Sequence, residues 1–170
     1  VNTELVLDTI NPNKDVDGFH TLNAGNLYLN RNSIIPCTPL GCLIMLNSLK
    51  LSLKGLHAVV IGRSNIVGKP MSQLLLRKNC TVSVVHSHTK NIKKIVKQAD
   101  IVIAAVGIAN YVQKSWIKSG AIVLDVGINR IVDNGKNKLV GDVDFDKVVD
   151  VVSAISPVPG GVGPMTIACL

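Results

Sequence analysis

The chain has 170 residues, of which 47% are hydrophobic, 17% charged and 3% aromatic, and its formal net charge is +7. This length and composition exclude an intrinsically disordered chain and indicate one compact domain with at most an appendage. The longest uncharged apolar run, residues 101–109, is far shorter than the roughly 20 residues that cross a membrane, so we expect no membrane contact and, from the charge, an anionic partner.

The first 35 residues do not follow the pattern of the rest of the chain. Residues 4–10 are partly helical in pattern, and residues 11–20 are polar and rich in turn formers. Thr38 is expected to cap a helix over residues 40–49, with Pro39 at its first position. This helix is apolar on nearly all sides, which predicts a helix between two domains whose other partner is missing.

From residue 57 onward, short β-branched runs alternate with longer amphipathic stretches. The stretches predict helices over residues 67–79 and 91–98, and Pro70 is tolerated because it falls in a first turn. Apolar strands that are separated by helices form a parallel sheet with helices on both faces. We therefore predict an α/β fold with a doubly wound, Rossmann-like sheet, whose strands span residues 57–61, 81–85, 101–105, 121–126 and 151–155.

The turn after the first strand is rich in glycine and runs from Gly62 to Gly68 with the sequence GRSNIVG. In Rossmann-like folds this turn lets a pyrophosphate approach the N-terminus of a helix. Ser64 stands where the G-x-G-x-x-G pattern has its second glycine, so an ordinary tight connection is the alternative interpretation. The position of the turn, after the first strand and before a helix, favours a dinucleotide cofactor.

The end of the second strand distinguishes NADP from NAD. An NAD site usually places a carboxylate there to bind the ribose 2′-hydroxyl, whereas residues 86–90 read HSHTK and contain none. Ser87 can donate to a 2′-phosphate, and Arg63 can approach it from the first turn. We therefore predict NADP. His86 and His88 alternate along the strand end and are expected to point to opposite faces, not to bind a metal.

The remaining charged and sulfur-containing residues argue against two other kinds of site. The lysines at positions 90, 93, 94 and 97 have the spacing of one solvated helix face without interleaved aromatic residues, so we expect no nucleic acid. The cysteines form no CxxC pair, which favours buried, reduced thiols in the cytoplasm and no metal. They are Cys37, Cys42, Cys80 and Cys169.

The chain opens on Val1 without a signal-peptide pattern, so we expect a fragment. Six of its segments resemble the bifunctional methylenetetrahydrofolate dehydrogenase/cyclohydrolase family, known in bacteria as FolD, in order and spacing. The resemblance covers essentially the whole chain, and the combination of GRSxIVGxP with PVPGGVGPMT is specific. The segments are KDVDGFH (14–20), IPCTPLG (35–41), VVIGRSNIVGKP (59–70), VLDVGIN (123–129), GDVDF (141–145) and SPVPGGVGPMT (156–166).

The resemblance implies an enzyme that oxidises 5,10-methylenetetrahydrofolate to the methenyl form with NADP and hydrolyses this to 10-formyltetrahydrofolate. It implies a cytoplasmic homodimer formed through the nucleotide domains, in the one-carbon metabolism that serves purine, methionine and histidine synthesis. Residues 1–35 would be a stub of the substrate domain and residues 36–164 the NADP-binding domain. Residues 165–170 would begin a helix that returns to the substrate domain.

The resemblance also assigns roles to particular residues. Asp17 would bind the pterin ring, since a carboxylate can accept from an amino group and an adjacent ring N–H, although spacing alone indicates a turn residue. Gly62, Arg63, Ser64, Ser87 and Ile128 would line the cofactor. The wall where nicotinamide and folate meet would comprise Thr38 and the loop residues Pro159, Gly160, Gly163 and Thr166. The Pro- and Gly-rich segment 157–164 predicts a stiff loop whose backbone can approach a ligand closely.

The family's Tyr-x-x-x-Lys helix has no counterpart, because neither Tyr28 nor Tyr111 is followed by lysine at that spacing. We therefore expect the catalytic lysine outside this chain and the isolated fragment to be inactive. Three alternatives remain open: a monofunctional dehydrogenase of the same fold, a non-catalytic NADP-sensing domain in which Asp17 tolerates Asn, and another Rossmann oxidoreductase such as a shikimate-type dehydrogenase. The last needs a catalytic Lys/Asp pair, for which the sequence offers no candidate.

Overall fold

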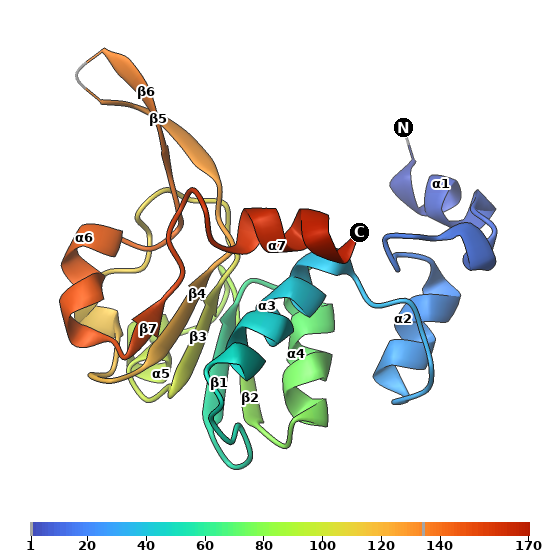
Figure 1. Ribbon diagram of the computed structural model, residues 1–170, viewed down its shortest axis with the longest axis horizontal. Coiled ribbons are helices and arrows are strands. Elements are labelled where there is room, and N and C mark those ends of the chain that lie inside the picture. Colours follow the sequence, from blue (N-terminus) through green and yellow to red (C-terminus); the bar gives the residue numbers. More distant parts are fainter. Residues whose placement is uncertain (1, 134) are drawn as a thin grey trace.

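The computed structural model describes residues 2–133 and 135–170 and is built around a five-stranded parallel sheet (Figure 1). The strand order is β2-β1-β3-β4-β7, and every neighbouring pair is parallel. This arrangement confirms the predicted Rossmann-like sheet. The strands are β1 (His57–Ile61), β2 (Thr81–Val85), β3 (Ile101–Ala104), β4 (Ile122–Asp125) and β7 (Ala154–Ile155).

Helices cover both faces of the sheet, because alternate residues of each strand point to opposite sides. Ala58 and Val60 of β1 belong to a core formed with α3 (Cys37–Ser48), α4 (Gly68–Arg77) and α7 (Val162–Cys169). Val59 and Ile61 of the same strand belong to a second core, formed with α5 (Ile92–Val96) and α6 (Phe145–Val148). The short 3-10 helices Lys114–Trp116 and Val149–Val151 complete this second face.

The N-terminal segment lies beside this unit and contains two helices, α1 (Thr3–Thr9) and α2 (Thr21–Tyr28), with the 3-10 turn Pro12–Lys14 between them (Figure 1). Arg77 of α4 fastens the segment, since its guanidinium donates to the carbonyl oxygens of Leu27 at 2.8 Å and Arg31 at 3.2 Å. The sequence pattern predicted a helix for α1 but not for α2.

Several element boundaries differ from the sequence-based expectation. Pro36, not Thr38, is the N-cap of α3, so the prediction of a Thr38 cap was wrong and Thr38 lies inside the first turn. Helix α7 begins at Val162, so Gly163 and Thr166 are helical and not loop residues. The fifth strand shortens to Ala154–Ile155 because residues 149–151 form a 3-10 turn.

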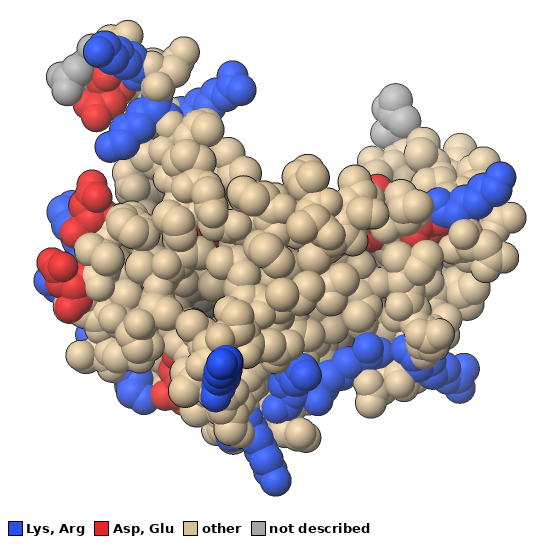
Figure 2. Space-filling model, viewed as in Figure 1, with Lys and Arg blue, Asp and Glu red and all other residues tan. Residues whose placement is uncertain are grey.

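Helix α3 packs against α7 as well as against the sheet, and Ile44 on its outer face remains 42% exposed. A Cβ atom on Gly41 of α3 would lie 3.1 Å from the Cβ of Met165, which shows how closely the two helices approach. Figure 2 shows that the surface over these helices carries few charges. Within residues 2–133 and 135–170, no helix has the length and apolarity to span a membrane.

A second, two-stranded antiparallel sheet projects from the domain (Figure 1). It consists of β5 (Asn129–Asp133) and β6 (Lys136–Val140) and was not expected from the sequence. Its strands are largely exposed and carry charged residues, so they lack the apolar run by which the central strands were recognised.

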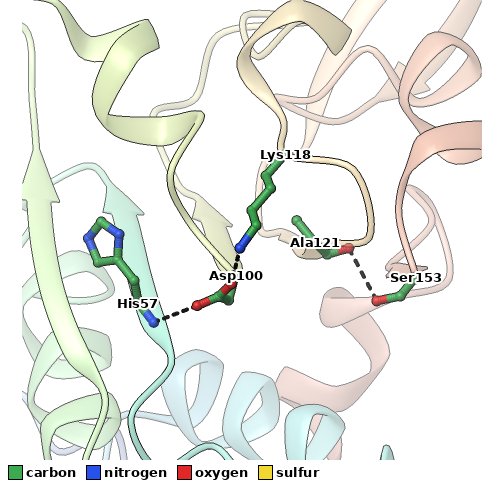
Figure 3. A network of polar contacts seen from close by, with 5 residues as sticks. All are labelled: His57, Asp100, Lys118, Ala121 and Ser153. Atoms are coloured by element: carbon green, nitrogen blue, oxygen red, sulfur yellow. Dashed lines mark hydrogen bonds and ion pairs between the residues drawn. The ribbon is translucent and has the colours of Figure 1, made fainter.

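Polar contacts fasten the amino edge of the central sheet (Figure 3). Asp100, just before β3, accepts the backbone N–H of His57 at 2.9 Å and the Lys118 ammonium at 2.6 Å. The hydrogen bond from Lys118, followed by that from His57, lowers the pKa of Asp100. Ser153 donates to the carbonyl of Ala121 at 3.3 Å, which joins the starts of β4 and β7. This edge is therefore structural, and the opposite edge carries the candidate site.

Candidate functional site

The candidate site lies at the carboxyl edge of the sheet, where β2 and β3 flank β1 on opposite sides. In doubly wound sheets, ligands bind in the crevice at this reversal of strand order. The loops that follow the strands meet there, and they contain most of the residues selected from the sequence.

The first turn is packed so closely that only glycine fits at its two ends. Gly62 has φ +122°, and a Cβ atom on it would overlap the carbonyl oxygen of Ala105. A Cβ on Gly68 would overlap the carbonyl oxygen of Gly62. Helix α4 therefore begins directly against the end of β1, with backbone packed on backbone at both ends of the turn.

Ser64 occupies the middle of this turn. Its hydroxyl oxygen accepts the backbone N–H groups of Val67 and Gly68, each at 3.2 Å. These are amides at the start of α4, where a phosphate would otherwise be the acceptor. Ser64 thus stabilises the turn at the position where the G-x-G-x-x-G pattern has its second glycine, and it stands next to the place where an anion would bind.

Arg63 and the end of β2 form a cationic corner beside this turn. Both Arg63 and Ser87 are exposed, and among the described residues the Arg63 guanidinium has no hydrogen-bonded or ion-paired partner. Desolvation, the Arg63 charge and His88 lower the pKa of His86. No carboxylate lies within residues 86–90 to repel an anion. The corner therefore suits a phosphate.

The two histidines do not point to opposite faces of a strand, so that prediction was wrong. Strand β2 ends at Val85, and His86 and His88 lie in the following turn with their ring centroids 5.9 Å apart. The backbone N–H of His88 donates to Nδ1 of His86 at 3.2 Å. Among residues 2–133 and 135–170, no group of three or more His, Cys, Asp or Glu residues could hold a metal ion.

Sequence reasoning missed two buried carboxylates at this edge. Asp125 ends β4, and its carboxylate accepts the backbone N–H groups of Gly127, Asp142 and Val143 at 2.8–3.0 Å. Burial raises the pKa of Asp125 to about 6 against the hydrogen bonds that lower it. The available signal was a charged residue at the end of an otherwise apolar strand, which usually means a partnered group.

Asp142 is the second of these carboxylates and is fully buried. Its Oδ2 accepts the backbone N–H groups of Val106 at 2.7 Å and Gly107 at 2.9 Å, and its Oδ1 accepts that of Ile108 at 3.0 Å. The side chain of Asn129 donates to Oδ1 at 2.9 Å. Asp142 therefore joins the loop after β3 to the chain after β4.

Ile128 and the start of α7 lie on the β4 side of the crevice. Ile128 is 63% exposed, and its Cδ1 lies 3.7 Å from the position of a Cβ on Gly163. One turn along α7, the Thr166 hydroxyl is 3.0 Å from the Thr38 hydroxyl. The structure thus brings Ile128 and Gly163 together, and separately joins Thr38 to Thr166.

Pro159 and Gly160 lie in the exposed loop that leads from β7 to α7. The Val158–Pro159 peptide bond is cis, and Gly160 has φ +101°. A Cβ on Gly161 would overlap the carbonyl oxygen of Pro157, so the loop folds back closely on itself.

The two aspartates of the segment KDVDG, Asp15 and Asp17, differ in burial and in hydrogen bonding. Asp15 is buried and accepts hydrogen bonds from Phe19, His20 and Asn23. Burial would raise the pKa of Asp15, but these bonds hold it below its usual value. Asp17 is exposed, and its carboxylate has no hydrogen-bond partner among the described residues. It is free to bind a ligand, whereas Asp15 shapes the turn.

Asp17 also lies near the first turn of α3. Burial raises the pKa of the Cys37 thiol, and the negative charge of Asp17 raises it further. Cys37, Cys42 and Cys80 are buried, and all four cysteines are free.

A cavity of about 650 Å³ separates the N-terminal segment from the first turn of α4. Its wall includes Asp8 and Phe19 on one side and Asn65 and Lys69 on the other. It therefore adjoins the glycine-rich turn from the side of the N-terminal helices and is distinct from the crevice at the carboxyl edge.

Comparisons with known proteins agree with this architecture. Residues 36–170 match the family model described as tetrahydrofolate dehydrogenase/cyclohydrolase, NAD(P)-binding domain. The chain is 56% identical over 177 residues to the bifunctional protein FolD of Zymomonas mobilis. The match covers 100% of this chain and 60% of that protein.

Two solved structures are also similar. The crystal structure of the bifunctional enzyme FolD, methylenetetrahydrofolate dehydrogenase/cyclohydrolase, from Campylobacter jejuni is 49% identical, with a TM-score of 0.94 over 98% of this chain and 58% of that chain. The FolD of Trypanosoma brucei, complexed with NADP cofactor and inhibitor, is 40% identical, with a TM-score of 0.94 over 99% of this chain and 59% of that chain. This chain thus spans about three fifths of the length of these relatives. It belongs to the tetrahydrofolate dehydrogenase/cyclohydrolase family, whose NAD(P)-binding domain matches residues 36–170.

Proposed function

We propose that this chain is the NADP-binding part of a bifunctional methylenetetrahydrofolate dehydrogenase/cyclohydrolase. The observation that carries the proposal is the glycine-lined turn from Gly62 to Gly68, placed beside the unpaired Arg63 at the reversal of strand order. Membership of the family supports it, as does the NADP complex of the Trypanosoma brucei relative.

The residues at the carboxyl edge fit the cofactor's chemical groups. The glycine-lined turn would let the pyrophosphate approach the N-terminus of α4, with the Ser64 hydroxyl, which already accepts the amides of Val67 and Gly68, beside it. Arg63 and Ser87 would hold the 2′-phosphate, and Ile128 would lie against the nicotinamide half on the β4 side. The chemistry that the bound cofactor supplies is acceptance of a hydride from the methylene carbon of the folate, which leaves the methenyl cation.

The folate would lie across the surface that includes Asp17, Thr38 and the loop before α7. Asp17 would accept hydrogen bonds from the pterin, and its exposed, unpaired carboxylate supports this role. The wall between folate and nicotinamide would comprise Pro159, Gly160, Gly163 and Thr166.

In the cyclohydrolase step, water adds to the methenyl carbon and a nearby base removes its proton before the ring C–N bond opens. We propose that this base is a lysine outside the 170 residues. This assignment makes the hydrolytic activity a property of the complete gene product.

The domain boundary and the assembly are part of the proposal. We assign residues 1–35 to the substrate domain, 36–164 to the NADP-binding domain, and 165–170 to the helix that returns to the substrate domain; the family match from residue 36 supports the first boundary. We propose a homodimer formed through the nucleotide domains, supported by exposed apolar residues on the projecting hairpin, such as Val132 at 74%. Neither a membrane nor nucleic acid is a proposed partner. The free, largely buried thiols support a cytoplasmic location.

The test uses the complete gene product and separates the two activities. Methylenetetrahydrofolate with NADP tests the oxidation, and methenyltetrahydrofolate without cofactor tests the hydrolysis. We expect both reactions. Oxidation without hydrolysis above the spontaneous rate would instead identify a monofunctional dehydrogenase, and NADP binding without either reaction would indicate a sensing domain.

A further inference from the structure

Asp142 holds three consecutive backbone amides with a single carboxylate. The N–H groups of Val106, Gly107 and Ile108 all donate to it at 2.7–3.0 Å. These residues form the loop after β3, on the far side of the strand reversal from the glycine-rich turn. Without this acceptor, three part-buried amides would lose their common partner at once, and each lost hydrogen bond to a charged group is costly.

The same carboxylate also fixes the chain around Ile128. Asn129 donates its side-chain N–H to Asp142 at 2.9 Å, and Gly127 donates its backbone N–H to the neighbouring Asp125 at 3.0 Å. Ile128 is therefore held on both sides by residues with buried carboxylate partners, while its own side chain remains 63% exposed.

The backbone packs closely around both carboxylates. A Cβ on Gly127 would overlap the Asp142 carboxylate, and a Cβ on Gly141 would overlap that of Asp125. The backbone N–H of Asp142 donates to Asp125 at 2.9 Å, so the two carboxylates are joined through the chain. No Lys or Arg is ion-paired with either one among the described residues, so neutral N–H groups stabilise both charges.

We infer that Asp142 is a positioning residue, which sets the loops after β3 and β4 so that they form a fixed wall for the nicotinamide half of the cofactor. The inference rests on the proposed function, because that function places a dinucleotide across the strand reversal. The adenosine half would contact Arg63 and Ser87, on the other side of the reversal, and does not depend on Asp142. The inference therefore predicts that the two halves of the cofactor respond differently to a change at Asp142.

The experiment compares two ligands on the complete gene product and its Asp142→Asn variant. Asparagine keeps the size of the side chain but replaces one acceptor oxygen with a donor that faces N–H groups. We expect the affinity for NADP to fall about tenfold or more. The affinity for adenosine 2′,5′-bisphosphate, which contains only the adenosine half, should stay within about twofold. The ratio of NADP to NAD affinity should also stay the same, and kcat should fall.

The matched control is Asp100→Asn, which removes a carboxylate that also accepts a backbone N–H, but at the amino edge. It should lower thermal stability and leave the affinities for both ligands unchanged. If Asp142→Asn does not fold, Asn129→Ala removes one of the four hydrogen bonds and should weaken NADP binding alone, by a smaller factor.

Equal weakening of both ligands in a folded Asp142→Asn variant, or no change in NADP affinity, would overturn the inference. An unchanged NADP affinity in Asn129→Ala would do the same if Asp142→Asn does not fold. A wild-type protein that binds NADP but does not oxidise the folate would contradict the proposed function, and the comparison of the two ligands would still decide the role of Asp142.

Discussion

Replacement of Arg63 by alanine tests the assignment of the cofactor. The guanidinium is exposed and has no ion-paired partner among the described residues, so a phosphate would bind it without breaking an existing contact. A charge-assisted hydrogen bond contributes about 1.5–3 kcal/mol, which corresponds to a factor of roughly 10 to 150 in affinity. We expect Arg63→Ala to weaken NADP binding by about this factor and to leave NAD binding nearly unchanged, because only NADP carries the 2′-phosphate.

The assay is titration calorimetry of the complete gene product with NADP and with NAD. Lys78→Ala is the control, since it removes one exposed positive charge just after the far end of α4. The Arg63 charge is one of the causes that lower the pKa of His86, so its removal raises this pKa. In the variant, more of His86 is therefore protonated near pH 6, and its positive charge partly replaces that of Arg63 beside the 2′-phosphate. The loss of NADP affinity should be smaller near pH 6 than near pH 8. Equal losses for NADP and NAD, or an equal loss in Lys78→Ala, would show that Arg63 does not bind the 2′-phosphate.

The remaining predictions concern the packing and charge of the site. Gly68→Ala places a methyl group against the carbonyl of Gly62. We expect it to lower the free energy of unfolding in urea by about 1–3 kcal/mol and to abolish NADP binding. Normal NADP binding would contradict the proposed close approach of α4 to the cofactor. Because burial raises the pKa of Asp125 from 3.8 to about 6, the folded state binds more protons between these values. The free energy of unfolding should fall by up to about 3 kcal/mol as pH rises through this window, and Asp125→Asn should lack this component; equal pH slopes would show that Asp125 does not titrate there. Thr38→Val should cost about 0.5–1.5 kcal/mol and Thr166→Val a similar amount, with a nonadditive double variant; additive costs would show that the two hydroxyls do not interact.

The centre of the sheet was predictable because its inner strands β1, β3 and β4 are buried on both faces. The run HAVVI in β1 is apolar whichever way a side chain points, and the same holds for IVIA in β3. The glycine-rich turn was predictable because Gly62 and Gly68 occupy positions where a side chain would meet backbone. Both patterns are local and need no knowledge of distant residues.

The errors arose where distant residues decide the structure. Thr38 was expected to cap α3, but its hydroxyl meets Thr166, which is 128 positions further along the chain. The hairpin of β5 and β6 has mainly exposed strands and therefore lacks a clear periodic pattern. The roles of Asp125 and Asp142 depend on backbone amides from three separate segments, and a single sequence does not place these segments together.

The proposed enzymatic function is tested by mixing the complete gene product with methylenetetrahydrofolate and following reduction of NADP and of NAD in parallel. We expect rapid reduction of NADP, much slower reduction of NAD at equal concentration, and subsequent appearance of 10-formyltetrahydrofolate. Failure to reduce NADP, despite saturable binding of the cofactor by a folded protein, would contradict the proposed enzymatic function. Faster reduction of NAD would contradict the roles assigned to Arg63 and Ser87.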